Sequence, residues 1–222
     1  MIKLLKILFE DESIIIVDKE HGVPSQPDKT GAENMVTLLQ EYLKNEFVGI
    51  VHRLDRPVGG VMVFAKTELA SKKLSTDFCN GLLEKEYMAI VCGEAREKDS
   101  LSHYLLKNER LNISKVVNKG TKGAKLAKLD YTREKIFCTE NDKKLSLIKI
   151  NLLTGRHHQI RVQLSSCKLP IWGDTKYNEL FSKKRQFVNL ALFSHKITFQ
   201  HPKTNKQVTF TSDTNFSFVG LE

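Results

Sequence analysis

An acidic residue, Asp55, lies between Arg53 and Arg56, directly before an apolar stretch at 61–65. Guanidinium groups favour the ionised form of a nearby carboxylate, and they also bind phosphate oxygens. The segment therefore has the residue types for a reaction on a polyanionic substrate such as nucleic acid. A solvated loop with an ordinary Arg and Asp pair has the same residue types, so the spacing alone leaves both interpretations open.

A second group of polar donors follows Gly155, where Ile160 and Leu164 are four positions apart, as on one face of a helix. The donors near its start are Arg156, His157, His158, Gln159 and Arg161. Such groups are suited to bind carboxylate or phosphate. A solvated, polar helix start is the alternative interpretation.

The histidines also raise the alternative of a metal-dependent hydrolase with His52, His157 and His158 as ligands. No HExxH or comparable ligand spacing supports it. The four cysteines show no CxxC spacing, so we expect neither a zinc site nor a disulfide framework. A reducing cytoplasm is the better setting for such a chain.

Composition indicates one compact domain with a polyanionic partner. A chain of 222 residues with 41% hydrophobic content can bury a sizeable core. The net charge of +9 favours nucleic acid, although a basic surface can also aid solubility or contact acidic lipid. Lysines cluster between Lys107 and Lys128, as in a flexible basic loop or hairpin, and a second basic group covers 183–185. Ordinary solvated surface is the alternative for both groups.

Apolar patterning predicts many short strands and few helices. Strands are expected over 14–17, 61–65, 87–91, 127–135, 145–150, 188–193, 195–199 and 207–210. Helices are expected over 35–43, over 68–80 and after Gly155, with a loop over 24–31. This pattern favours an α+β fold with a mixed, largely antiparallel sheet.

The order of these segments resembles that of pseudouridine synthases of the RluA type. Besides the two polar stretches, the similarity includes Lys19–Pro24, Lys85–Gly93, Leu169–Asp174, Leu190–His195 and Phe199–Pro202. It covers nearly the whole chain. The resemblance implies one catalytic domain over residues 1–222, with flanking helices around the mixed sheet and a central active-site cleft.

The resemblance also implies a reaction, the isomerisation of specific uridines in rRNA or tRNA. The N1 to C1′ bond breaks, the uracil turns, and a C5 to C1′ bond forms. Asp55 matches the catalytic carboxylate of the family, and Arg161 matches the basic residue that pairs with it. Tyr87 matches the tyrosine that packs against the uracil and is implicated in removing the C5 proton. Whether Asp55 attacks C1′ or assists loss of the base by another route stays open, and no cofactor or metal is implied.

The remaining candidate residues are expected to bind the substrate. Arg53 matches an arginine near the space left by the flipped nucleotide, and the other candidates are Arg56, Arg156, His158 and Gln159. Taking the uridine out of its stack costs a few kcal/mol, about what phosphate contacts can offset.

Four positions depart from the family pattern. Val58-Gly59-Gly60 stands where Thr-Ser-Gly is usual, Gln163 replaces a common His, and Asn178 replaces a frequent Gly. The valine removes a hydroxyl that could form a hydrogen bond near Asp55.

A non-catalytic RNA-binding protein with the same fold is the main alternative, against which the intact Asp55, Tyr87 and Arg161 argue. The first expected strand begins within about fifteen residues of Met1, which leaves no room for the N-terminal S4-type module often found in the family. Substrate selection is then expected to rest on loops of the catalytic domain. The apolar N-terminal stretch is too short for a signal or membrane helix. We therefore expect a cytoplasmic monomer that binds no membrane.

Overall fold

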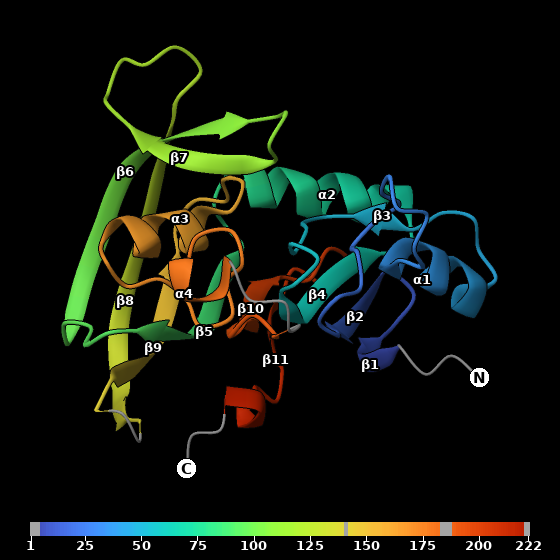
Figure 1. Cartoon of the computed structure of the whole chain (residues 1–222). Coiled ribbons are helices and arrows are strands. Elements are labelled where there is room, and N and C mark those ends of the chain that lie inside the picture. Colours follow the sequence, from blue (N-terminus) through green and yellow to red (C-terminus); the bar gives the residue numbers. More distant parts are fainter. Residues whose placement is uncertain (1–4, 140–141, 183–187, 220–222) are drawn as a thin grey trace. The chain divides into compact units, whose positions relative to one another are not determined.

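The structure is a computed structural model that describes residues 5–139, 142–182 and 188–219 (Figure 1). The chain divides into two compact units. Unit 1 comprises Met1–Lys85 and Phe193–Thr214, and unit 2 comprises Glu86–Leu192 and Asn215–Glu222. The expectation of a single catalytic domain over 1–222 stays a prediction.

Unit 1 is built on strands β1 (Lys6–Glu10), β2 (Ile14–Lys19), β3 (Gly49–Ile50), β4 (Gly59–Ala65), β10 (Leu192–Gln200) and β11 (Gln207–Thr211). Strand β4 is antiparallel to β2 and β3, and it pairs in parallel with β10. The hairpins β1–β2 and β10–β11 are antiparallel. The sheet is therefore mixed, as expected.

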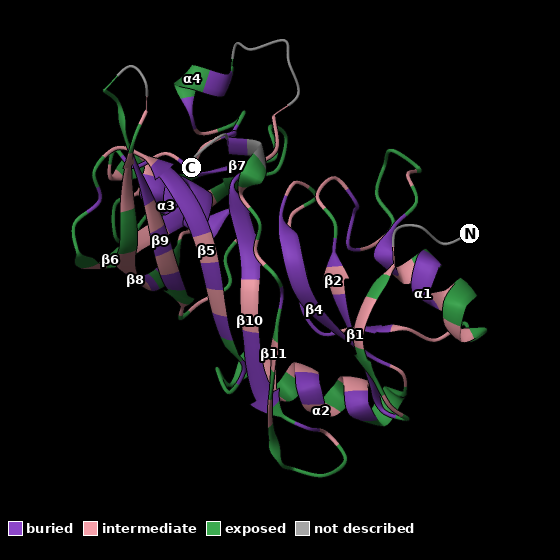
Figure 2. Cartoon of the chain, turned by 90° about the horizontal axis from the view of Figure 1, so that it is seen from below, coloured by how far each residue is buried: buried purple, intermediate pink, exposed green. Residues whose placement is uncertain are grey.

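Two helices, α1 (Met35–Leu43) and α2 (Glu68–Cys79), complete unit 1. Each begins at a polar cap, because the side chains of Asn34 and Thr67 accept hydrogen bonds from backbone N–H groups three residues later. Burial colouring shows β4 buried along its whole length (Figure 2). A strand buried on both faces has a continuous apolar sequence rather than an alternating one.

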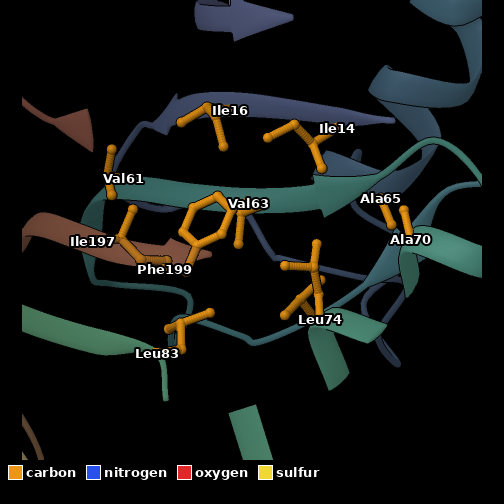
Figure 3. Packing of buried hydrophobic residues seen from close by; sticks show 11 residues of the cluster. Ile14, Ile16, Val61, Val63, Ala65, Ala70, Leu74, Leu83, Ile197 and Phe199 are labelled. Carbon is orange, nitrogen blue, oxygen red and sulfur yellow. The ribbon is translucent and has the colours of Figure 1, made fainter. Parts of the chain in front are cut away.

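The core of unit 1 joins strands β2, β4 and β10 to helix α2. Ala70 and Leu74 of α2 pack in one cluster with Val63 of β4 and Phe199 of β10 (Figure 3). This packing holds the strand that follows the Asp55 segment.

Unit 2 is an antiparallel sheet in the order β5, β9, β8, β6, β7. Its strands are β5 (Glu84–Cys92), β6 (Lys98–Asn108), β7 (Ile113–Val117), β8 (Lys125–Cys138) and β9 (Lys144–Leu152). Helix α3 (Gln159–Ser166) lies against β6 and β7. A short helix, α4 (Glu179–Ser182), and a 3-10 turn at Ser217–Val219 follow.

Most predicted elements are confirmed, and with them the α+β class. The predicted strand over 188–193 is wrong, because 188–191 is irregular and β10 continues without interruption through Ser194. The hydroxyl of this polar residue donates to Val61 O at 3.0 Å, so Ser194 lies within the sheet. The hairpin interpretation of the basic stretch 107–128 is confirmed by β6, β7 and β8.

Two further observations concern the chain as a whole. The basic group at 183–185 lies outside the described residues. Among the helices that the structure describes, none is long and apolar enough to span a bilayer.

Candidate active site

Asp55 lies in the loop 51–58, just before β4, and is half-buried. The backbone turns here, because Val58 N donates to Asp55 O at 2.9 Å. Gly60 follows with φ +109°, and a Cβ at this position would lie 2.2 Å from Ser194 O. Only glycine therefore fits where β4 and β10 meet.

The side chain of Val58 is buried, so this position has apolar packing where the threonine usual in the family would place a hydroxyl.

The two arginines that flank Asp55 bind a neighbouring loop, residues 22–30. Arg56 Nε donates to Gly22 O at 2.9 Å, and its Nη1 lies 3.9 Å from Asp28 Oδ2. Arg53 Nη1 donates to Gln26 Oε1 at 3.3 Å. An effect of these arginines on the Asp55 carboxylate stays a prediction. Both guanidinium groups remain exposed, as phosphate contact requires.

A buried cation, Lys19, lies beside the Asp55 loop. Its ammonium donates to the carbonyl oxygens of Glu20 at 3.0 Å, Val23 at 2.8 Å and Arg56 at 3.3 Å. Burial lowers the pKa of Lys19 to about 7, and attraction to the Asp55 carboxylate opposes that shift. The sequence signal for this residue is its place at the end of a buried apolar strand.

In unit 2, Tyr87 lies on β5 in register with Ile150 of β9, and it is 6% exposed. The predicted strand position is thus confirmed. The role of this tyrosine in the reaction stays a prediction.

Arg161, on helix α3, forms a bidentate ion pair with Asp174. Its Nε and Nη2 donate to Asp174 Oδ2 and Oδ1, each at 2.8 Å, and both residues are buried. Asp174 Oδ1 also accepts from the backbone N–H groups of Lys176 at 2.9 Å and Tyr177 at 3.1 Å. Planar, two-point contact of this kind fixes the orientation of a guanidinium group. Sequence reasoning gave Asp174 no role, although it lies in a segment similar to the family.

Gln159, expected to bind substrate, is a buried residue, and that role stays a prediction. It is 3% exposed, and its Oε1 accepts from Thr154 Oγ1 at 2.8 Å and Arg156 N at 2.9 Å. Its Nε2 donates to Lys128 O at 3.0 Å. Gln159 therefore holds the loop before α3. Arg156 remains exposed, and its Nε donates to Leu126 O at 3.1 Å.

His158 is also buried, and it delays the start of the helix. Its backbone is left-handed, with φ 52°, so α3 begins at Gln159 rather than directly after Gly155. Its Nδ1 lies 2.8 Å from Tyr177 Oη, and its ring stacks on His157. Burial and the nearby Arg161 charge lower the pKa of His158 to about 2, so the ring is neutral at physiological pH. The substrate-binding role expected for His158 stays a prediction.

Comparison with known proteins identifies the family. A family model described as RNA pseudouridylate synthase matches residues 13–166, which include parts of both units. The chain belongs to this family. It is an RNA pseudouridine synthase, an isomerase that acts on uridine in RNA.

Two relatives and one solved structure illustrate the similarity. An uncharacterized RNA pseudouridine synthase of Mycoplasma pneumoniae is 32% identical over 216 residues, covering 96% of this chain and 68% of the relative. A tRNA pseudouridine synthase C of Haemophilus ducreyi is 31% identical over 228 residues, covering 94% and 90%. The structure of human RNA pseudouridylate synthase domain containing 1 has the same fold, with a TM-score of 0.79 at 20% identity and coverage of 96% and 84%.

The histidines of this synthase have structural contacts that do not support the hydrolase alternative. His52 is buried and accepts from Val63 N at 3.3 Å, and burial lowers its pKa to about 3. The two ring nitrogens of His157 lie within hydrogen-bond distance of Ser114 and Asn112. Across the described ranges, no group of three or more His, Cys, Asp or Glu is arranged to hold a metal ion.

Proposed function

We propose that Asp55 is the catalytic carboxylate of this synthase and that Tyr87 and Arg161 act on the same uridine. The observation that carries the proposal is the position of Asp55, half-buried on a hydrogen-bonded loop before β4 and electrostatically attracted to the buried ammonium of Lys19. An ionised carboxylate is what either route to breaking the N1 to C1′ bond requires.

Two routes remain for Asp55. It attacks C1′ and forms a covalent intermediate, or it assists departure of the uracil without a bond to carbon. In both routes the uracil turns, C5 bonds to C1′, and the C5 proton leaves. We assign reception or relay of that proton to the hydroxyl of Tyr87, whose ring stacks on the uracil.

Arg161 supplies a second positive charge for the carboxylate. A guanidinium has five N–H donors, and Asp174 accepts two of them. In this proposal Asp174 holds Arg161 in one orientation, so that the cation does not have to reorganise during the reaction.

The exposed arginines Arg53, Arg56 and Arg156 are proposed to bind RNA phosphates, together with the basic hairpin from Lys107 to Lys128. The seven lysines and arginines of this hairpin are all exposed, and Glu109 is the one acidic residue in the stretch. Such a surface suits the backbone of a folded RNA.

We propose tRNA as the substrate, and rRNA is the alternative that the sequence left open. The relative from Haemophilus ducreyi, which is similar over most of its length, is named as a tRNA pseudouridine synthase. A cytoplasmic location and a monomeric state stay predictions.

The test compares pseudouridine maps of total RNA from cells with and without the gene, by chemical labelling and primer extension. We expect at least one tRNA uridine to lose its modification without the gene. Complementation with Asp55→Ala should fail to restore it, although the purified variant should bind the tRNA within several-fold of the parent, since phosphate contacts come from other residues. Restoration by Asp55→Ala would refute the role of Asp55, and a loss confined to rRNA would refute the substrate assignment.

A further inference from the structure

Ser25 is a buried residue that binds both backbone groups of the residue before Asp55. Its Oγ accepts from Leu54 N at 3.1 Å and donates to Leu54 O at 2.7 Å. Ser25 is 5% exposed, so water does not readily replace it. One hydroxyl can do both, because it carries one donor and two acceptor positions.

The bond to Leu54 O holds the peptide group that leads into Asp55, and the bond from Leu54 N holds the peptide group before it. The carbonyl of Leu54 and the amide nitrogen of Asp55 belong to the same planar peptide unit. When Ser25 fixes that carbonyl, it therefore also fixes the direction in which the Asp55 backbone begins.

The backbone after Asp55 is held by residues shortly before Ser25 in the sequence. Arg56 O accepts from Gly22 N at 2.9 Å and from Lys19 Nζ at 3.3 Å. The next carbonyl, of Pro57, lies 2.7 Å from His21 Nδ1. Asp55 is thus the residue between two anchored peptide groups, and Ser25 provides the anchor on the side that leads into it.

We propose that Ser25 is a positioning residue that sets the orientation of the Asp55 carboxylate. The proposal rests on the proposed catalytic role of Asp55. Reactions of a positioned group depend steeply on geometry, and an error of about 1 Å can lower the rate by about 100-fold. Loss of the Ser25 hydroxyl should therefore lower kcat more than it weakens RNA binding, because the exposed arginines are unchanged.

The chain offers a matched control, a second buried serine whose hydroxyl also bonds to two backbone groups. Ser146 of β9, in unit 2, accepts from Ala95 N at 2.9 Å and donates to Gly93 O at 2.8 Å, and it is fully buried. Like Ser25→Ala, Ser146→Ala removes one hydrogen bond accepted from a backbone N–H group and one donated to a backbone carbonyl. Neither bond of Ser146 involves a neighbour of Asp55, Tyr87 or Arg161 in the sequence.

The experiment measures kcat and KM by tritium release from tRNA transcript labelled at C5 of uridine, together with the RNA dissociation constant and the thermal midpoint. Ser25→Ala should lose about 10- to 100-fold in kcat, with a dissociation constant within about twofold of the parent. Ser146→Ala should lose a comparable amount of thermal stability and keep kcat within about twofold. Ser25→Cys fills the same space with a weaker hydrogen-bonding group, and its kcat should lie between those of the parent and Ser25→Ala.

Equal kcat values for Ser25→Ala and Ser146→Ala would show that Ser25 contributes to stability but does not position Asp55. Should Ser25→Ala fail to fold, Ser25→Cys decides, because parental kcat in that variant would overturn the proposal. Asp55→Ala is measured in parallel. Activity in Asp55→Ala would refute the proposed function itself, whereas an inactive Asp55→Ala with a fully active Ser25→Ala would refute only the role of Ser25.

Discussion

Replacing Asp174 by Asn should destabilise the protein strongly, because this carboxylate is the buried counter-charge of Arg161. Both Asp174 oxygens receive a guanidinium N–H at 2.8 Å, and the side chains are 4% exposed for Arg161 and 0% for Asp174. The asparagine amide keeps one acceptor but turns an N–H group toward the guanidinium. Removing one partner of a buried ion pair costs about 3–5 kcal/mol.

That cost is large against the total stability of a protein domain, about 5–15 kcal/mol. At about 2–4 °C per kcal/mol for a chain of this size, the thermal midpoint should fall by about 6–20 °C. Activity at a temperature where the variant is still folded should also fall, since Arg161 loses the contact that orients it.

A double-mutant cycle measures the interaction energy between Arg161 and Asp174 apart from their contacts with other residues. Arg161→Met removes the cation and leaves an apolar side chain of similar length, so Asp174→Asn should cost much less in the Arg161→Met background. We expect the two changes to fall short of additivity by about 1–3 kcal/mol in urea unfolding. Additive losses would show that the two side chains are not energetically coupled, and the proposed orientation of Arg161 by Asp174 would then be wrong.

Three further predictions concern the reaction, pH and salt. Tyr87→Phe keeps the ring and deletes the hydroxyl, so it should bind tRNA nearly as well as the parent, since base stacking contributes about 1–3 kcal/mol, yet release little tritium from C5; parental release would make Tyr87 a packing residue only. Burial lowers the pKa of His52 to about 3 in the folded state, below its usual value of 6.5, so its contribution to stability is complete above pH 6.5 and is lost as the pH falls toward 3. In that range the free energy of unfolding falls by about 1.4 kcal/mol for each pH unit. In urea unfolding at several pH values, the free energy of unfolding of His52→Gln should fall less steeply with acid than that of the parent. Changing Lys119 and Lys122 of the basic hairpin to Gln should lower the slope of log affinity against log salt by up to about 2, and an unchanged slope would remove this hairpin from the RNA interface.

Most elements of unit 1, apart from strands β1 and β3, could be predicted because their signals are local. The apolar run at 14–17 and the one at 61–65 require burial wherever they lie, and Asn34 and Thr67 start their helices through bonds to nearby residues. Strand β6 was not predicted, since its sequence mixes Lys, Asp, Ser and His with few apolar residues. Its position depends on pairing with β8 and β7, which a local pattern does not record.

The candidate site was predictable in its residue types but not in its contacts. Arg156 and Gln159 are both polar residues before a helix, and only the fold distinguishes the exposed guanidinium from the buried amide. The contact of Arg161 with Asp174 could not be found from spacing, because Asp174 follows it by 13 positions and comes from a loop. Similarity to a family identified Asp55, whereas the contacts of Ser25 became visible only in three dimensions.

The parallel pairing of β4 with β10 also has a consequence for synthesis on the ribosome. Val61 and Ser194 are joined by a hydrogen bond across 133 positions of sequence. At translation rates of about 5–20 residues per second, β10 is synthesised on the order of 10 s after β4. During that interval one edge of this wholly apolar strand is paired only at its end, by β3, and such an edge is the type of surface on which nascent chains aggregate or recruit chaperones. The sheet of unit 2 can form once β9 has been made, before β10 is synthesised, so the part of the chain made first is completed last.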